Sequence, residues 1–374
     1  MVRRFMRYPV PTNLNIWWAG GSVLLFCLIR QIGRGLILSF HYQAHETTAF
    51  RSIQYITNDV AWGWFFRGIH INTCVFFFFV MYLHIGRGIF YGSYLKHKVW
   101  YTGVVIMFLL VVVAFLGYTL PWGQLSFWAA VVVTNILTGI PYVGKRITIW
   151  LLGGYVVNCK TLQRFYILHL FLPFVLLLFT LLHVYFLHEV GSGDPLGLDR
   201  SISRVGFHPY YTYKDIFVLW HFVAVLYYFV FFEPYYFLEA SNYVRANYYK
   251  TPNVVHPEIY LIFAYRILCA CNTKNGGLLA MLLSILILVV LPVICPHNIS
   301  VGFQWHWLLE IWFGLWCANF VYLTCLGYKE DFDRKPSQGK CCTLFHFSLF
   351  FAIRPVVKLD SVVLRVLSKK NFKI

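Results

Sequence analysis

Long apolar stretches constrain this chain more than any other feature of its sequence. Each is close to the roughly 20 residues that a helix needs to cross the hydrocarbon core of a bilayer. Only 12% of the residues are charged, whereas soluble domains average about a quarter. The sequence therefore predicts an all-α, polytopic membrane protein with eight transmembrane helices, at residues 17–40, 65–91, 101–120, 162–188, 215–232, 277–295, 303–326 and 341–357.

Two of the connecting loops are themselves partly apolar. The loop between the third and fourth spans is interrupted by Gly139 and Pro141, and we interpret it as a pair of interfacial helices. The segment PEIYLIFAYRIL, between the fifth and sixth spans, is a further interfacial candidate. An even number of spans places both termini on one side of the membrane.

The formal net charge of +17 is distributed over the loops and does not form one basic tract. Because most of the chain would lie in lipid, we expect contacts with anionic lipids such as cardiolipin and with acidic surfaces of partner subunits, not with nucleic acid. The ten cysteines form neither CxxC nor CxxCH, so the sequence supports neither a zinc ribbon nor a covalently attached haem.

Two pairs of histidines lie inside the second and fourth predicted spans. His70 and His84 are 14 residues apart, and so are His169 and His183. Fourteen helical residues return a side chain to within about 40° of its starting face, about 21 Å further along the axis. The two spans run in the same direction, because one further span separates them, so His70 is level with His169 and His84 with His183. This pattern predicts two bis-imidazole metal cofactors, one above the other across the bilayer.

Glycines repeat with the same period in the first and third spans. Gly21 and Gly35 lie in the first, and Gly103 and Gly117 in the third. Glycine in a membrane helix often serves helix packing alone. Two glycines with the period of the histidines, on both flanking helices, favour flat macrocycles pressed against the backbone.

Arginines lie near both ends of the second span. Arg67 is three residues before His70, and Arg87 is three residues after His84. They have two open interpretations: interfacial arginines whose head groups reach the membrane surface, or cationic partners of haem propionates.

At these residues the chain resembles cytochrome b of the respiratory cytochrome bc complex, complex III. Further motifs that match in order and spacing are GYTLPWGQLSFW (117–128), TNILTGIPYVG (134–144), LHEVGSG (187–193), FHPYYTYKD (207–215) and PEIY (257–260). The resemblance covers about residues 10 to 300. It implies two haems b, the low-potential one at His70 and His169 and the high-potential one at His84 and His183. It also implies a first unit at 1–214, the di-haem four-helix bundle with its interfacial loop helices, and a second unit of four helices at 215–374.

The resemblance further implies a quinol oxidation site on the positive side and a quinone reduction site on the negative side. The first would contain Glu258, which can accept a proton, with Tyr118, Tyr260 and Tyr265 around it. In the second, His188 and Asp215 would supply protons, with Ser192 and Lys214 nearby. Ubiquinol and ubiquinone are the implied substrates. The implied setting is the mitochondrial inner membrane, in a homodimer of protomers that include a Rieske iron–sulfur protein, cytochrome c1 and other complex III subunits.

The chain departs from the family pattern at three places. Ile259 replaces the usual tryptophan of PEWY, so the pocket shape can differ while the acid and the tyrosine remain. Ala129 replaces a usual glycine, which implies resistance to strobilurin-type inhibitors of quinol oxidation. Arg30 and Arg34, four residues apart on one face of the first span, require an acidic partner, a lipid phosphate or a haem propionate.

Three alternatives are less consistent with the sequence. Cytochrome b6 has one more residue between the second pair of histidines and ends after four spans. A metal transporter would place acidic or sulfur ligands beside the histidines and would not need the paired glycines. A ferric reductase would need a nucleotide-binding domain, and the chain has no GxGxxG motif.

Overall fold

Eight long apolar helices dominate the computed structural model, which describes residues 7–198, 203–253, 255–294, 302–328 and 336–371. This confirms the predicted eight spans, although the last residue of the predicted sixth span, Cys295, lies outside the described residues. The first span begins as a 3-10 turn, η1 (Ile16–Ala19). The long helices are α2 (Gly20–Ser39), α4 (Gly63–Phe90), α5 (His97–Thr119), α8 (Cys159–Val190), α9 (Tyr210–Phe232), α11 (Lys274–Ile294), α12 (Trp307–Tyr328) and α13 (Pro336–Asn371).

The start and end of α8 have clear local causes. Asn158 caps the first turn by accepting a hydrogen bond from the backbone N–H of Lys160, and the Thr161 hydroxyl accepts one from the backbone N–H of Asn158. The helix ends at Gly191, whose φ of +78° is readily adopted only by glycine. Between these ends α8 carries both His169 and His183.

Helices α2, α4, α5 and α8 pack together, with α5 against α8 and α2 against α4. Val23, Phe78, Met107 and Leu176, which come from these four helices, are buried in one apolar cluster. Helix α9 packs against α4 through a smaller cluster of Ile69, Leu226 and Val230. The division of the chain at residue 214 stays a prediction.

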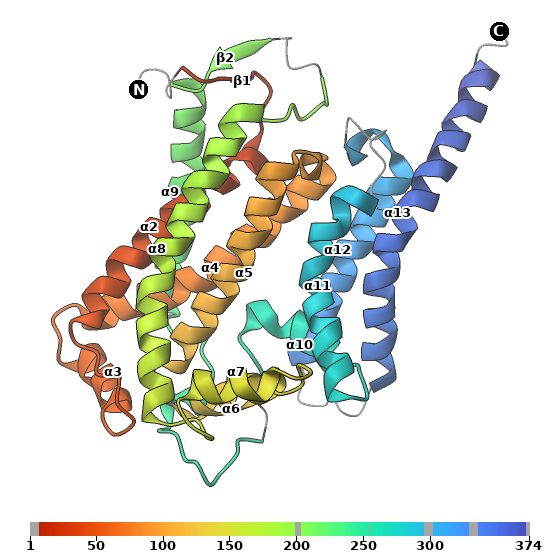
Figure 1. The fold of residues 1–374 in the computed structure, drawn as a ribbon. Coiled ribbons are helices and arrows are strands. Elements are labelled where there is room, and N and C mark those ends of the chain that lie inside the picture. Colours follow the sequence, from red (N-terminus) through yellow and green to blue (C-terminus); the bar gives the residue numbers. More distant parts are fainter. Residues whose placement is uncertain (1–6, 199–202, 254, 295–301, 329–335, 372–374) are drawn as a thin grey trace.

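The connecting segments gather at the two ends of the long helices (Figure 1). The predicted interfacial pair is present as α6 (Gln124–Leu137) and α7 (Gly144–Leu152), and the later candidate as η4 (Ile259–Leu261) and α10 (Ile262–Cys269). The sequence did not predict a further short helix, α3 (Ala49–Asn58), because the apolar pattern there is weak.

A small antiparallel β-ribbon lies at the end of the long helices that is opposite α6 and α7, where α13 also ends (Figure 1). It pairs β1 (Pro9–Pro11) with β2 (Arg204–Gly206), two segments that are far apart in the sequence. The remaining short elements are the 3-10 turns η2 (Ser93–Leu95), η3 (Ala240–Tyr243) and η5 (Phe303–Trp305).

Helices α10 to α13 form a second group beside the first helices (Figure 1). Phe263, Ile267 and Leu323 are buried between α10 and α12. The indole N–H of Trp312 donates a 2.7 Å hydrogen bond to the carbonyl of Leu349, which ties α12 to α13.

Candidate functional site

The structure brings the four histidines together as two pairs across α4 and α8. The ring centres of His70 and His169 are 6.3 Å apart, and those of His84 and His183 are 6.5 Å apart. The packing of α4 against α8 thus places His70 level with His169, and His84 level with His183, as the sequence pattern predicts.

These distances can be compared with what one iron held by two imidazoles requires. Two metal–nitrogen bonds of about 2 Å and about 1.1 Å from each nitrogen to its ring centre give about 6.2 Å between ring centres. Both observed distances, 6.3 and 6.5 Å, agree with this requirement. Each pair could therefore hold the iron of a haem between its two imidazoles.

Hydrogen bonds orient the two α8 histidines. Nδ1 of His169 lies 2.9 Å from the carbonyl oxygen of Val113, and Nδ1 of His183 lies 3.0 Å from the hydroxyl of Thr102. A carbonyl or hydroxyl that accepts the Nδ1 proton leaves Nε2 free for a metal. The α8 imidazoles therefore have the tautomer that an axial ligand needs.

The α4 histidines have different surroundings. Nδ1 of His70 is buried and has no hydrogen-bond partner among the described residues. Nδ1 of His84 accepts a 3.1 Å hydrogen bond from the guanidinium of Arg87. Among the described residues, therefore, neither α4 histidine has a partner that accepts a proton from Nδ1, in contrast to the α8 histidines.

The four period-14 glycines all face the histidines. A Cβ added at Gly117 would lie 2.5 Å from Cε1 of His169, and one at Gly103 would lie 3.2 Å from Cε1 of His183. The corresponding distances are 3.4 Å from Gly35 to His70 and 3.7 Å from Gly21 to His84. A side chain at Gly117 or Gly103 would thus displace an imidazole. That the four glycines also border a flat macrocycle stays a prediction.

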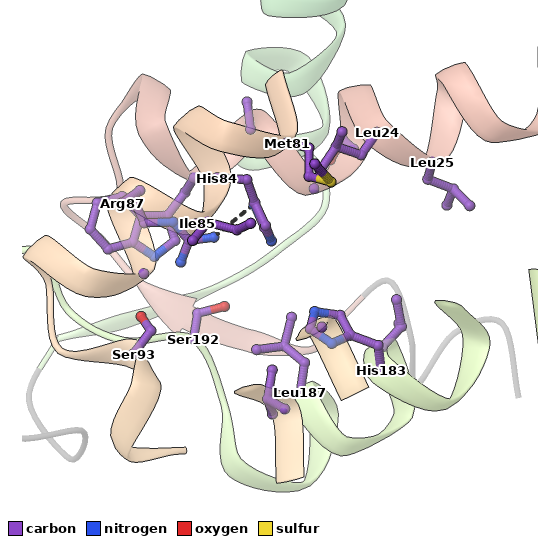
Figure 2. A pocket seen from close by; sticks show the side chains of 18 of the residues that line it. Leu24, Leu25, Met81, His84, Ile85, Arg87, Ser93, His183, Leu187 and Ser192 are labelled. Carbon is purple, nitrogen blue, oxygen red and sulfur yellow. Dashed lines mark hydrogen bonds between the residues drawn. The ribbon is translucent and has the colours of Figure 1, made fainter. Parts of the chain in front are cut away.

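A cavity of about 710 Å³ surrounds the pair of His84 and His183. Figure 2 shows the two rings entering it from opposite sides, with Arg87 beside His84. Gly21, Gly103 and Ser192 also line this space. Its volume and its mostly apolar wall suit a large flat cofactor with a polar edge.

A second cavity, of about 240 Å³, surrounds the pair of His70 and His169. Gly35, Gly117 and Arg67 also line it. The ligand geometry fits haem here as well, and the donor set is the same.

Glu258 lies in the second cavity with Tyr118 and Tyr260. The pKa of Glu258 is raised to about 7, chiefly because the carboxyl group is buried; a hydrogen bond with Tyr260 opposes this rise, and repulsion from Glu239 adds to it. The Tyr260 ring is stacked on Phe78, with ring centres 4.1 Å apart. The carboxyl group is thus held in place and changes charge near neutral pH.

Other residues predicted for this site are placed elsewhere. Tyr265 lies in α10 and does not line the cavity. Ile259 is exposed, and Ala129 is buried within α6 without lining the cavity. Neither departure from the family pattern therefore changes the cavity wall directly.

Asp215 and Lys214 line the first cavity, on the side of His84. The Ser22 hydroxyl donates a hydrogen bond to Asp215, and Lys214 donates one of 3.2 Å to the carbonyl of Leu14. His188 does not line this cavity: its ring is stacked on Tyr8, with ring centres 4.4 Å apart.

The two arginines of α2 differ in their surroundings. Arg34 is 7% exposed, and its guanidinium donates a 3.0 Å hydrogen bond to the hydroxyl of Thr73. Arg30 is exposed and lies 5.0 Å from the centre of the Phe26 ring. No carboxylate of the described residues forms an ion pair with either arginine, so among these residues the partner of Arg34 is a hydroxyl. A lipid phosphate or a haem propionate as the partner of either arginine stays a prediction.

Sequence reasoning missed Thr102 and Ser22, which contact His183 and Asp215. Each directly adjoins a glycine of the period-14 pattern, Gly103 or Gly21. A small polar residue beside such a glycine is the available sequence signal, because the close helix approach at the glycine brings its neighbour within hydrogen-bond distance.

Comparisons with known proteins agree with this geometry. The family model described as Cytochrome b/b6/petB matches residues 5–191, and the model described as Cytochrome b(C-terminal)/b6/petD matches residues 245–347. The chain is also similar to a solved structure titled "Hyperthermophilic respiratory Complex III", with 31% sequence identity, a TM-score of 0.89, and coverage of 96% of this chain and 95% of that one. This chain belongs to the cytochrome b family and is the haem-b-binding membrane subunit of a bc-type oxidoreductase complex.

Proposed function

We propose that the chain is the cytochrome b of a quinol–cytochrome c oxidoreductase and contains two haems b, one held by His70 and His169 and the other by His84 and His183. The observation that carries this proposal is the pair of ring-centre distances, 6.3 and 6.5 Å, at two levels of the same two helices. When bound, the haems supply an electron path across the membrane, and two imidazoles each leave no open position for oxygen.

Two arginines of α4 would bind the propionates of the two haems. Arg67 and Arg87 line the two cavities near opposite ends of α4, where their charge can pair with propionates. Among the described residues Arg67 also donates a 3.1 Å hydrogen bond to Thr57, which fixes its guanidinium. The arginines of α4 would thus orient the haems. Val113 and Thr102 would fix which ring nitrogen of His169 and His183 carries the proton.

At the quinol oxidation site, Glu258 would accept a proton from the bound quinol. A quinol that loses two electrons must also release two protons, so this site needs a base close to the low-potential haem. Glu258 shares its cavity with His70 and His169. Tyr118 and Tyr260, in the same cavity, would orient the quinol ring.

At the quinone reduction site, Asp215 would return protons to the quinone. It lines the same cavity as His84 and His183, and Ser22 holds its carboxyl group. Lys214 and Ser192 add hydrogen-bond donors to this wall. His188 lies outside the wall, stacked on Tyr8, and would act as a relay between this cavity and water.

The proposed setting is the mitochondrial inner membrane, with ubiquinone as the substrate. The partners would be a Rieske protein, cytochrome c1 and other complex III subunits, in a homodimer of protomers with bound cardiolipin. A reduced-minus-oxidised spectrum of the purified complex, titrated against potential, tests the central claim. Two b-type transitions would support it, and a single transition or none would contradict it.

Replacement of Glu258 with glutamine is expected to slow quinol oxidation by about 10²-fold or more, the usual contribution of a positioned base. Only the deprotonated carboxylate accepts a proton, and its pKa is raised to about 7. The wild-type rate should therefore fall as the pH is lowered through about 7, and this dependence should vanish in Glu258→Gln. The measurement is the rate of cytochrome c reduction by quinol against pH.

Glu239→Gln is the matched control, because Glu239 lines the same cavity. Since Glu239 raises the pKa of Glu258 by repulsion, its removal should shift the acid limb of the profile to lower pH and keep the maximal rate. An unchanged rate in Glu258→Gln would exclude this glutamate as the proton acceptor.

A further inference from the structure

A third cavity, of about 570 Å³, lies between α4 and the second group of helices. Its volume is within the range of about 300–1,000 Å³ that is typical of small-molecule sites. Aromatic residues make up much of the wall, and Phe79, Phe263, Phe313 and Phe320 are among them. None of the four histidines of the proposed haem sites lines it. The cavity suits a molecule that dissolves in the membrane.

Three side chains of this mostly apolar wall have a buried nitrogen without a hydrogen-bond partner among the described residues: His346, Trp316, and Arg87, whose Nε is unpaired while its guanidinium also donates to His84. His346, on α13, is 2% exposed, and neither of its ring nitrogens has a hydrogen-bond partner among the described residues. The same holds for the buried indole N–H of Trp316, on α12. Their ring centres are 6.5 Å apart, and both residues line the cavity. A buried donor without a partner destabilises the folded protein, because it has lost its hydrogen bonds to water. A bound molecule with a hydrogen-bond acceptor would remove this cost.

The depth of His346 and Trp316 in the membrane limits which molecules can supply the hydrogen-bond acceptor. His346 is nine residues from the start of the span Ser337–Val363, and Trp316 is nine residues from the start of Trp307–Tyr328, which is about 13 Å in each case. The hydrocarbon core is about 30 Å thick, so both lie near the middle of the bilayer. The ester carbonyls and phosphate of a phospholipid lie at the membrane surface and do not reach this depth.

The third cavity also adjoins the cavity of Glu258. Tyr82 lines the third cavity, and its hydroxyl donates a 2.7 Å hydrogen bond to the backbone carbonyl of Tyr260, which lines the cavity of Glu258. Leu261, the next residue along the chain, lines the third cavity. Tyr82 and the backbone of Tyr260 therefore touch between the two spaces.

We propose that the third cavity binds a neutral, membrane-dissolved quinone whose carbonyl oxygens accept hydrogen bonds from His346 and Trp316. A quinone combines an apolar body with carbonyl acceptors and can enter the middle of the bilayer. The site binds without reaction and holds a quinone next to the quinol oxidation site. This role rests on the quinol oxidation site proposed above, whereas binding of the quinone itself does not depend on the proposed haem ligands.

Photolabelling of the purified complex tests this proposal. The probe is an azidobenzoquinone with a short isoprenoid tail, and labelled peptides are identified by mass spectrometry. We expect labelling of α12 and α13 that excess unlabelled quinone suppresses. In the double variant His346→Leu/Trp316→Phe, which removes the donors and keeps an apolar wall, this labelling should fall about tenfold or more. Labelling of peptides around Glu258 and Asp215 should not change.

Trp307→Phe/His221→Leu is the matched control, because both residues are exposed and neither lines the cavity. It should label as the wild type does. The reduced-minus-oxidised spectrum of each variant shows whether the complex is assembled, and it reports separately on the haem proposal. If the double variant does not assemble, the competition experiment on the wild type still decides the question.

Three outcomes would overturn the proposal. The first is a wild-type complex without competed labelling in α12 or α13. The second is unchanged labelling in the double variant. The third is native mass spectrometry that finds a phospholipid bound to the wild type and lost from the double variant, while quinone labelling stays the same.

Discussion

Replacement of His169 with leucine is expected to abolish one of the two b-type redox transitions and to stop electron transfer across the membrane. Leucine has no nitrogen to offer the iron, and its partner His70, whose ring centre is 6.3 Å from that of His169, would be left as a single ligand. The other pair lies on the same two helices, 14 residues away, and should keep its haem. Redox potentiometry of the purified complex, followed by optical spectra, measures both transitions.

His221→Leu is the control for this experiment. His221 is also a histidine of a membrane helix, but it is exposed, and its Nδ1 hydrogen-bonds to the carbonyl of Phe217 in its own helix. Both transitions should survive there. Retention of both transitions in His169→Leu would show that this histidine is not a ligand.

Even the small change of Gly117 to alanine is expected to impair the haem site of His70 and His169. The added Cβ would lie 2.5 Å from Cε1 and 3.0 Å from both ring nitrogens of His169, which is closer than non-bonded atoms can approach. The ring must then move away from Val113, its hydrogen-bond partner. Overpacking of this kind lowers the free energy of unfolding by about 1–3 kcal/mol. We therefore expect reduced haem content and a lower unfolding temperature.

The other glycines allow a graded test of the same idea. Gly103→Ala, with a contact of 3.2 Å, should have a smaller effect, and Gly21→Ala, at 3.7 Å, the smallest. Gly33→Ala is the control, because a Cβ there would meet nothing within 4 Å. Haem-to-protein ratios and thermal unfolding measure the series. An equal loss at Gly33 and Gly117 would exclude the close approach to His169 as the cause.

The fold was largely predictable because the bilayer simplifies the problem. An apolar run of membrane length must form a helix to satisfy its backbone hydrogen bonds, so all eight spans were found from hydropathy. Helix α3 was missed because its ten residues are mostly polar or moderately apolar and carry no such requirement. The pairing of β1 with β2 was also missed, because it joins segments almost 200 residues apart.

The candidate site was predictable as a set of residues but only partly as an arrangement. Helical periodicity gave Gly117 the same 14-residue period as the histidines, and only the structure shows that it lies against His169. It did not predict that His188 is stacked on Tyr8 and lies outside the cavity wall. Nor did it predict that Arg34 hydrogen-bonds to Thr73, because a buried arginine can be satisfied by any acceptor that the neighbouring helix provides.

The sequence by itself determined the number of spans, the relative direction of α4 and α8, and which histidines lie at the same level. These follow from local rules, namely the helical repeat and the alternation of direction between successive spans. Only the tertiary structure decided the distances between rings, the orientation of each imidazole, and the presence of a third cavity whose wall contains His346 and Trp316, both unpaired among the described residues. Those depend on how α4, α8, α12 and α13 approach one another, and side chains distant in the sequence fix that approach.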